Sequence, residues 1–359
     1  MGYKLREKIS FLMDDAETKI RFAVRRRYQR KGIDALSTNT KPLSKEQKRQ
    51  IREYWRPYTK HICYKWHEYI TSLNGEFDVR YIPADLLATD IENHFNDWYS
   101  AHGIDNKNNY QYYFPEIRHP EAVLHKMRGV WHLGNYELAS FDRVVEECMK
   151  YDHLIFKYAM ESGRGGGIFF WQASQGKNAL LSVLKELPDD AVGQKFIGQH
   201  PALAQFNPTS VNTIRIVTFV FENKIHVLSA YLRMGTDGAQ LDNVSQTGLC
   251  AAITPDGTLK SKGLDGPGNF HTEHPCGIVF DGFKVPGWEN VVKAAKTLHN
   301  KMGNFHLISW DFAVDEDEQP VFIEMNIKYA GMIFHEVFNG PLFGDMTDRV
   351  LDEVYGKKK

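Results

Sequence analysis

Two short apolar stretches near the end of the chain flank an acidic turn: Ile308-Ser309-Trp310-Asp311-Phe312-Ala313-Val314, then Asp315-Glu316-Asp317-Glu318-Gln319, then Val321-Phe322-Ile323-Glu324-Met325-Asn326. This pattern predicts a β-hairpin. Because side chains alternate between the faces of a strand, Glu324 and Asn326 share one face, and pairing across the turn can place Asp311 opposite them. Carboxylate and amide oxygens suit Mg²⁺. The three side chains are therefore candidate metal ligands, and solvent-facing strand residues are the alternative.

The composition is that of an ordinary globular protein. The chain has 359 residues, of which 42% are hydrophobic and 25% charged, which is enough for two or three domains. No apolar run approaches the roughly 20 residues that cross a bilayer, and the N-terminus lacks the apolar core of a signal peptide. The four cysteines are widely spaced, which favours reduced, structural thiols. We therefore expect a cytoplasmic protein without a transmembrane segment.

Charge is unevenly distributed along the chain. The net charge of −1 argues against a dedicated nucleic-acid binder, but residues 1–60 hold 17 Lys and Arg against 7 Asp and Glu. Residues 19–31 combine basic residues with apolar ones at helical spacing. Such a segment could rest peripherally on an anionic membrane surface or bind an acidic polymer. A basic helix that packs on its own domain is the simpler explanation.

The N-terminal third reads as helical. Helical periodicity extends to about residue 73, with a break at 37–42 and a second helix near Ser44, where Ser44 and Gln47 can form a capping box. Residues 80–120 mix short helices with loops, including the polar stretch 105–109. These signals predict a helical N-terminal region.

Strand patterns follow. The apolar run 154–159, which contains Lys157, leads through the glycine-rich segment 162–168 into a second short strand. The loop has neither Rossmann nor Walker spacing. Glycines such as Gly165 and Gly166 let backbone N–H groups approach an anion, although a purely structural turn is the alternative. Residues 179–187 then read as a short amphipathic helix.

An antiparallel strand pair comes next in the sequence. After a strand at 191–197, residues 211–220 and 225–233 read as two long strands joined by a tight turn. Arg215 lies in the middle of the first of these apolar strands. Because burying an unpaired charge is very costly, Arg215 needs an anionic partner.

In this order, the segments resemble the ATP-grasp superfamily, and more closely the sugar-transfer-associated ATP-grasp proteins. The resemblance covers roughly residues 120–345 and rests on the hairpin and on five further motifs: 199–203, 207–216, 241–243, 274–277 and 285–288. It implies an α+β fold in which two subdomains grip ATP between antiparallel sheets, preceded by the helical N-terminal region. The expected parts are 1–115 (helical), 116–200 (small subdomain with the glycine loop) and 201–359 (C-terminal subdomain with the metal site).

The resemblance also implies roles for individual residues. Phosphate contacts would come from basic residues and the glycine loop: Lys126, Lys157, Gly165, Gly166 and Arg215. Adenine would meet the backbone next to Gln194: Lys195, Phe196 and Ile197. One or two Mg²⁺ ions, with Mn²⁺ as an alternative ion, would bind the hairpin oxygens: Asp311, Glu324 and Asn326. Arg215 and Lys157 would stabilise the reacting phosphate. Arg233 and Asn243 would contact the carboxylate substrate, with structural roles as the alternative.

The implied activity is an ATP-dependent carboxylate–amine ligase. The carboxylate is phosphorylated, and an amine displaces phosphate from the acyl phosphate to form an amide. Small-molecule substrates such as a sugar acid or nucleotide sugar, on the way to a capsule or other cell-surface polysaccharide, are expected. A phosphotransferase, a small-peptide ligase or a non-catalytic nucleotide-binding subunit are the alternatives. Where relatives carry a glycine pair, the segment Gln246-Thr247-Gly248 departs from the pattern.

Overall fold

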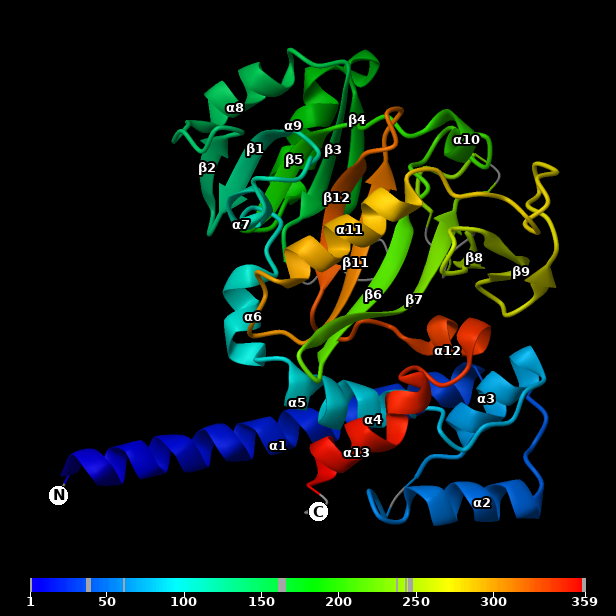
Figure 1. Ribbon diagram of the computed structural model, residues 1–359. Helices are drawn as coiled ribbons and strands as arrows, with labels where there is room; N and C mark the ends of the chain where they lie inside the picture. Colours follow the sequence, from blue (N-terminus) through cyan, green and yellow to red (C-terminus); the bar gives the residue numbers. More distant parts are fainter. Residues whose placement is uncertain are drawn as a thin grey trace. The chain divides into compact units, whose positions relative to one another are not determined.

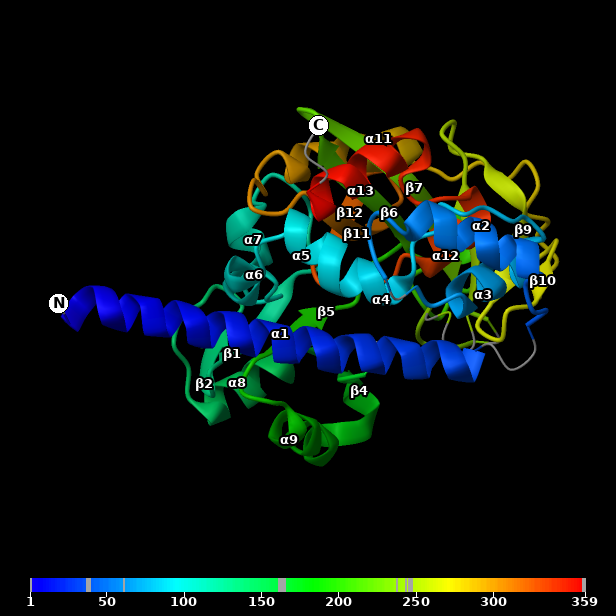
Figure 2. The same cartoon turned by 90° about the horizontal axis from the view of Figure 1, so that it is seen from below.

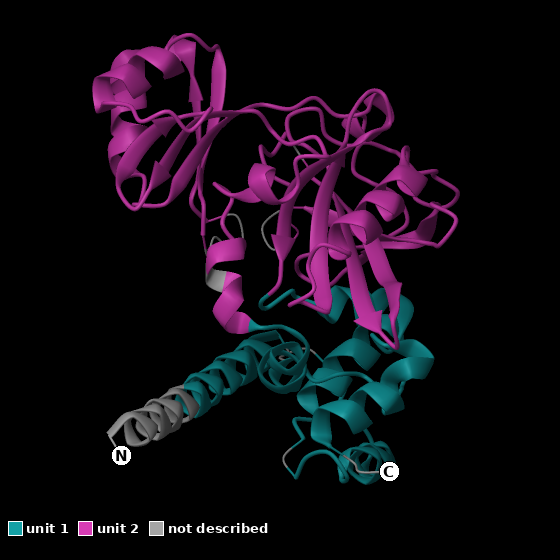
Figure 3. Cartoon of the chain, turned by 60° about the vertical axis from the view of Figure 1, so that its left-hand side comes forward, with its two compact units in different colours: residues 1–97, 328–359 teal, residues 98–327 magenta. Residues whose placement is uncertain are grey.

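The chain divides into two compact units in the computed structural model, which describes residues 2–36, 40–60, 62–160, 166–236, 238–242, 244 and 248–356. One unit joins Met1–Asp97 to Lys328–Lys359, and the other is Trp98–Ile327 (Figure 3). This division differs from the predicted one in two ways. The boundary between the units lies at residue 97, although short helices continue to residue 113, and the last 32 residues belong with the N-terminal helices. Residues 116–200 and 201–327 of the two predicted subdomains share the second unit.

Unit 1 is built of helices. They are α1 (Gly2–Leu36), α2 (Lys45–Trp55), α3 (Lys65–Asn74), α4 (Ala84–Leu86), the π-helical turn η2 (Leu87–Ile91), α5 (Glu92–Phe95), α12 (Ile333–Asn339), the 3-10 turn η4 (Gly344–Met346) and α13 (Thr347–Tyr355). The capping box predicted at the start of α2 is present. The Ser44 hydroxyl accepts from the Gln47 N–H at 3.1 Å, and the Gln47 side chain accepts from the Ser44 N–H at 2.9 Å. No helix in the described part of the chain is long and apolar enough to cross a membrane.

The basic helix α1 packs on its own unit through part of its charge. Arg26 pairs with Asp90 at 2.6 Å and Arg30 pairs with Asp85 at 2.8 Å, so α1 lies against α4 and η2 (Figures 1 and 2). These pairs agree with the simpler explanation for the basic segment. Contact of residues 19–31 with a membrane stays a prediction; Ile20 and Val24 are exposed there.

Two buried glutamates tie the C-terminal segment into unit 1. Glu336 on α12 accepts hydrogen bonds from the backbone N–H groups of Ile82 and Leu342, at 2.9 and 3.1 Å. Glu92 accepts from those of Tyr329 and Ala330. Backbone donors that would otherwise be buried without partners are thereby satisfied. Burial raises the pKa of Glu336 to about 8, because desolvation outweighs these two bonds.

Unit 2 contains two antiparallel sheets. The smaller has the strand order β2-β1-β5-β3-β4. Its strands are β1 (Ala122–Met127), β2 (Val130–Leu133), β3 (His153–Tyr158), β4 (Ile168–Gln172) and β5 (Ala191–Lys195). Helix α8 (Phe141–Cys148) packs against β1 and β2, and α9 (Gly176–Glu186) packs against β4 after the 3-10 turn η3 (Ala173–Gln175). These helices cover a core that includes Leu124, Phe156 and Trp171.

The larger sheet has the order β10-β9-β8-β7-β6-β11-β12. Its strands are β6 (Ile214–Phe221), β7 (Lys224–Met234), β8 (Leu249–Ile253), β9 (Leu259–Asp265), β10 (Phe270–His271), β11 (Leu307–Val314) and β12 (Pro320–Asn326). Helix α11 (Trp288–His299) lies across β6, β7, β11 and β12 (Figure 1) and covers a core that includes Ile216, Trp310 and Phe312. The short helices α6 (Trp98–Ile104), α7 (Tyr110–Tyr113) and α10 (Pro201–Ala204) complete the unit.

The predicted hairpin is confirmed. Strands β11 and β12 pair antiparallel, with Asp311 directly opposite Glu324 and Ser309 opposite Asn326. The pair β6–β7 is confirmed as well.

The pKa of Glu336 gives a testable consequence for stability. Its folded-state pKa of about 8 exceeds the ordinary value of 4.5, so the folded protein binds this proton more tightly than the unfolded chain does. Stability should therefore fall as pH rises from about 4.5 to 8, by up to about 1.4 kcal/mol per pKa unit. Glu336→Gln keeps the accepting Oε1 but cannot ionise, so its stability should depend less on pH in urea denaturation between pH 5 and 8.5. The exposed substitution Glu76→Gln is the control, and equal pH dependence of Glu336→Gln and wild type would contradict the role of burial.

Candidate functional site

Strand register gathers charged side chains on the face of the larger sheet away from α11. Paired residues of neighbouring strands point to the same face, and Asp311 pairs with both Arg215 and Glu324. Ile216, Trp310 and Phe312, one residue along their strands, point to the α11 core instead. The alternation of the strands thus separates an apolar face from a charged one.

A buried ion cluster lies at the centre of this charged face. Asp311 has no exposed surface; its Oδ1 accepts from Arg215 Nε at 2.8 Å, and its Oδ2 from Arg215 Nη2 at 2.7 Å and Arg233 Nη2 at 3.0 Å. Arg233 also donates to the Thr213 hydroxyl and lies 3.4 Å from Asp242. Burial would raise the pKa of Asp311, but the two guanidinium charges hold it well below its usual range.

The cluster confirms that Arg215 has an anionic partner, which is Asp311. The predicted contacts of Arg215 with phosphate and of Arg233 with a carboxylate substrate stay predictions. The side chains of both arginines remain 16% exposed. The Nη1 atoms donate no hydrogen bond to a described residue, so each guanidinium keeps donors for a further anion.

Metal binding can be tested against the donor set of the hairpin. Glu324 is 23% exposed and has one ion pair, to Lys107 at 3.0 Å. The Asn326 Nδ2 and the Ser309 Oγ beside it are buried without a hydrogen-bond partner. Asp311 Oδ1 accepts from Arg215 Nε at 2.8 Å, and a carboxylate oxygen can accept two hydrogen bonds. Carboxylate and amide oxygens are donor types that suit a divalent cation, but Asp311 already accepts from two guanidinium groups, and no three His, Cys, Asp or Glu side chains in the described ranges form a metal-type group.

Lys157 faces the same space from the smaller sheet. It pairs with Val192 in register, and Val192 pairs with His125, so all three point to the face away from α8 and α9. The Lys157 ammonium forms no hydrogen bond or ion pair with a residue that the structure describes. Desolvation and the neighbouring charge of Lys107 lower its pKa to about 8, against the attraction of Glu324 and Asp242.

Lys126 does not join Lys157, which corrects the expected pair of phosphate lysines. Lys126 pairs with Ala191, one residue out of phase with His125, so it points to the helix-covered face. There its ammonium donates to the Leu187 carbonyl at 2.9 Å and lies 5.0 Å from the Trp131 ring centre. Register alone separates Lys126 from the charged site.

Lys107 is the lysine that sequence reasoning missed. It belongs to the polar stretch 105–109, its side chain is 10% exposed, and it pairs with Glu324 on β12. In the sequence the stretch reads only as a polar loop, whereas the structure buries Asn106 and Asn108, whose residue type favours the surface.

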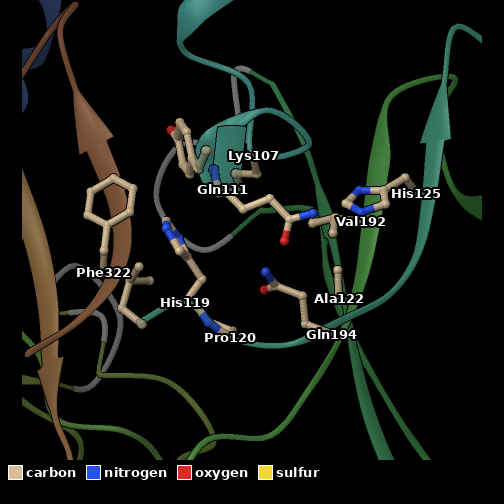
Figure 4. Close-up of a pocket in the computed structure, with 11 residues that line it drawn as sticks. Lys107, Gln111, His119, Pro120, Ala122, His125, Val192, Gln194 and Phe322 are labelled. Carbon is tan, nitrogen blue, oxygen red and sulfur yellow. The ribbon is translucent and has the colours of Figure 1, made fainter. Parts of the chain in front are cut away.

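A pocket lies beside these groups, between the two sheets of unit 2. It is lined by aromatic and amide side chains that include Tyr110, Gln111, Gln194 and Phe322. Figure 4 shows Phe322 and His125 on opposite sides, with Gln111 and Gln194 between them. The lining thus offers both aromatic ring surface and amide hydrogen-bonding groups.

The strand that follows Gln194 was predicted to meet adenine. The Lys195 N–H is already bonded to the Glu121 carbonyl at 2.9 Å, whereas the backbone of Phe196 and Ile197 makes no hydrogen bond with another described residue. Those two residues keep backbone groups for a ligand. Gly166 lies in the turn that leads into β4. The predicted sites Gly165 and Asn243 lie outside the described residues.

The family described as sugar-transfer associated ATP-grasp matches residues 171–350, which is half of the chain. The chain belongs to this family and has the ATP-grasp fold, as the motifs indicated.

Comparison with solved structures adds distant likenesses. The L-amino acid ligase from Bacillus licheniformis is 15% identical with a TM-score of 0.40, over 70% of this chain and 48% of that one. The VanG D-Ala:D-Ser ligase from Enterococcus faecalis is 15% identical with a TM-score of 0.46, over 73% and 63%. The D-alanine–D-alanine ligase from Bacillus anthracis is 13% identical with a TM-score of 0.41, over 74% and 72%.

The chain thus spans about half the length of the first of these structures. No curated protein matches the chain.

The buried cluster predicts a large effect of Asp311 on stability. Asp311→Asn would leave two guanidinium groups without their shared counter-charge, so we expect a loss of about 3–5 kcal/mol in the free energy of unfolding. The control is Asp317→Asn in the exposed turn of the same hairpin, which should change stability by less than about 0.5 kcal/mol. Urea denaturation measures both. Equal stability of Asp311→Asn and wild type would mean that the two arginines do not depend on Asp311.

Proposed function

We propose that this protein is an ATP-dependent carboxylate–amine ligase that forms an amide through an acyl phosphate. The observation that carries the proposal is the unpaired ammonium of Lys157, which faces Glu324 and Asp242 across the space between the sheets. A desolvated cation without a partner is costly in a folded protein. A phosphate anion would supply the missing charge, so the site is best explained as the binding place of a nucleotide's phosphates.

The other groups support the same ligand. The pocket beside Gln194 would contact the face of the adenine base. The backbone groups of Phe196 and Ile197, which bond to no other described residue, would bind its polar edge. Glu324, Asn326 and Asp311 would hold Mg²⁺, which neutralises phosphate charge when bound. The proposal includes one or two bound Mg²⁺ ions, with Mn²⁺ as an alternative ion. Metal-binding measurements test the number and the identity of the ions.

The proposed reaction has two steps. A carboxylate oxygen of the first substrate attacks the γ-phosphorus of ATP, the bond from that phosphorus to the β-γ bridging oxygen breaks, and ADP leaves. The amine nitrogen then attacks the acyl carbon, phosphate leaves with the carbon–oxygen bond pair, and the amine loses a proton. Arg215 would stabilise the charge that develops on the transferred phosphoryl group, and its Nη1, which Asp311 does not use, supports this role. Alignment and charge stabilisation suffice for this chemistry.

The family description supports a proposal for the substrate class. A sugar-transfer associated enzyme would act on a sugar acid or a nucleotide sugar, and its product would enter a capsule or another cell-surface polysaccharide. The amine substrate is a small molecule. Arg233, which is flanked by Asp242 and Asp311 but keeps its Nη1 donors, is the proposed contact to the carboxylate.

Lys157 gives a prediction for nucleotide affinity. Lys157→Met should weaken binding of Mg–ADP by about 10- to 100-fold at pH 7, because a charged hydrogen bond contributes about 1.5–3 kcal/mol. Wild-type affinity should fall as pH rises above about 8, where free Lys157 loses its proton while Lys107, Glu324 and Asp242 face it. Lys157→Met should lack this fall. Calorimetric titration at pH 7 and 9 measures both, with the exposed Lys177→Met as control; a pH-independent wild-type affinity would contradict the assignment.

The products formed from ATP distinguish a ligase from a phosphotransferase and from a non-catalytic subunit. With ATP, Mg²⁺ and pools of sugar acids and amines, a ligase forms ADP and free phosphate only when both substrates are present, and hydroxylamine converts the acyl phosphate into a hydroxamate. Glu324→Gln should lower the rate of this turnover by at least about 100-fold. A phosphorylated product without free phosphate would identify a phosphotransferase instead. Nucleotide binding without turnover on any pool would favour a non-catalytic subunit.

A further inference from the structure

Helix α1 has one face that packs on its own unit. Ile33 on this face has no exposed surface. Arg26 and Arg30 lie on the same side of the helix, because they precede Ile33 by seven and three residues, and they pair with Asp90 and Asp85. Unit 1 therefore covers this side of α1 and neutralises two of its cations.

The opposite side of α1 carries large apolar side chains that are in contact with solvent. Ile20, Val24 and Tyr28 are four residues apart, so they form a stripe along the helix. Ile20 is 66% exposed, Val24 64% and Tyr28 53%. Single apolar side chains on a surface are ordinary, whereas three in register form a continuous apolar patch of the kind that marks a contact surface.

Cations flank this stripe without acidic neighbours in the sequence. Residues 18–33 contain seven Lys and Arg and no Asp or Glu. Arg27 and Lys31 are exposed beside the stripe, and neither forms a hydrogen bond or an ion pair with a residue that the structure describes. Five residues together make up what we call the outer face of α1: Ile20, Val24, Arg27, Tyr28 and Lys31.

The combination of charge and apolar surface distinguishes between three occupants of the outer face. A second copy of α1 would place cations against cations, because residues 18–33 offer no carboxylate. A soluble acidic polymer would pair with Arg27 and Lys31 but leave the apolar stripe in water. A membrane surface that contains anionic lipids meets both needs, since its headgroups attract the cations and its acyl region accepts Ile20 and Val24. The ring and hydroxyl of Tyr28 suit the headgroup level between them.

We propose that the outer face of α1 docks on an anionic lipid surface, with the helix lying in the plane of the interface. Arg26 and Arg30 keep their partners in unit 1 in this arrangement, so docking requires no rearrangement of the fold. A short apolar stripe with a few cations gives reversible binding to the surface. The docking does not depend on the proposed ligase activity, because the residues of the nucleotide site all lie in unit 2.

Sedimentation of the full chain with lipid vesicles tests the docking. Wild type should bind vesicles of phosphatidylcholine and phosphatidylserine, mixed at roughly 2:1, at least about tenfold more tightly than vesicles of phosphatidylcholine alone. The preference arises from attraction of Arg27 and Lys31 to the anionic headgroups. Added salt should weaken the binding, because it screens exposed charges.

Two double variants separate the apolar part of the outer face from the charged part. Ile20→Ser with Val24→Ser should weaken binding to the phosphatidylserine vesicles by at least about tenfold, because less apolar surface leaves water. Arg27→Gln with Lys31→Gln should weaken it by about tenfold or more and remove most of the preference for phosphatidylserine. All four side chains are exposed, so thermal denaturation should show the same stability as wild type.

Matched controls come from unit 2. Leu138→Ser with Val279→Ser removes two apolar side chains of similar exposure, 67% and 54%. Lys177→Gln with Lys185→Gln removes two exposed cations from α9. Neither pair of substitutions should change the affinity for either kind of vesicle.

Four outcomes would overturn the docking. In the first, wild type does not bind the phosphatidylserine vesicles; in the second, the serine double variant binds them as tightly as wild type does. In the third, light scattering detects dimers that the serine variant abolishes, which would assign the outer face to a second copy. In the fourth, dextran sulfate competes with the vesicles and the glutamine variant alone loses binding, which would assign the outer face to a soluble polyanion. ADP binding by calorimetry should be the same in wild type and all four double variants, so loss of the proposed nucleotide site is detected separately.

Discussion

The buried carboxylate of Asp311 between Arg215 and Arg233 is the interaction on which this site depends. Three charges in the interior of a sheet are tolerated only because each pairs at hydrogen-bonding distance. The triplet carries one excess positive charge toward the space between the sheets. With Lys107, Lys157, Glu324 and Asp242 nearby, basic side chains outnumber acidic ones. A triphosphate with its metal is still negative, so charge complementarity favours that ligand over a free cation.

Strand alternation turns this local chemistry into a two-sided sheet. Asp311 lies between Trp310 and Phe312, which are buried under α11, so one strand supplies side chains to both the core and the site. A register slip of one residue would place Asp311 in the aromatic core. The apolar face therefore secures the position of the charged face. Packing of the apolar face therefore holds the charged side chains on the opposite face of the sheet in fixed positions.

The sequence predicted the parts that local pattern decides. Alternation and the acidic turn predicted the hairpin, the capping box predicted the start of α2, and the cost of burial predicted a partner for Arg215. The sequence does not show which face of β1 carries Lys126. The neighbouring residues Val123 and Leu124 are both apolar, so either face of the strand could be the buried one. Nor could the sequence place Lys107, whose loop is fixed by Asn108 contacts distant in sequence. The return of the C-terminal helices to unit 1 depends on Glu92 and Glu336 bonding remote backbone groups.

Burial of Lys157 lowers the stability of the fold, and the phosphates of a bound nucleotide would offset this cost. A buried cation with a lowered pKa, beside Lys107 and without an anion at hydrogen-bonding distance, is unfavourable for folding. Replacing it by an apolar residue would stabilise the protein but remove the charge that a phosphate needs, a conflict common to binding sites. Lys107 meets the same constraint differently, since it has Glu324 as a partner. The two lysines therefore differ in how their charge is compensated, since Lys107 has a carboxylate at hydrogen-bonding distance and Lys157 has none.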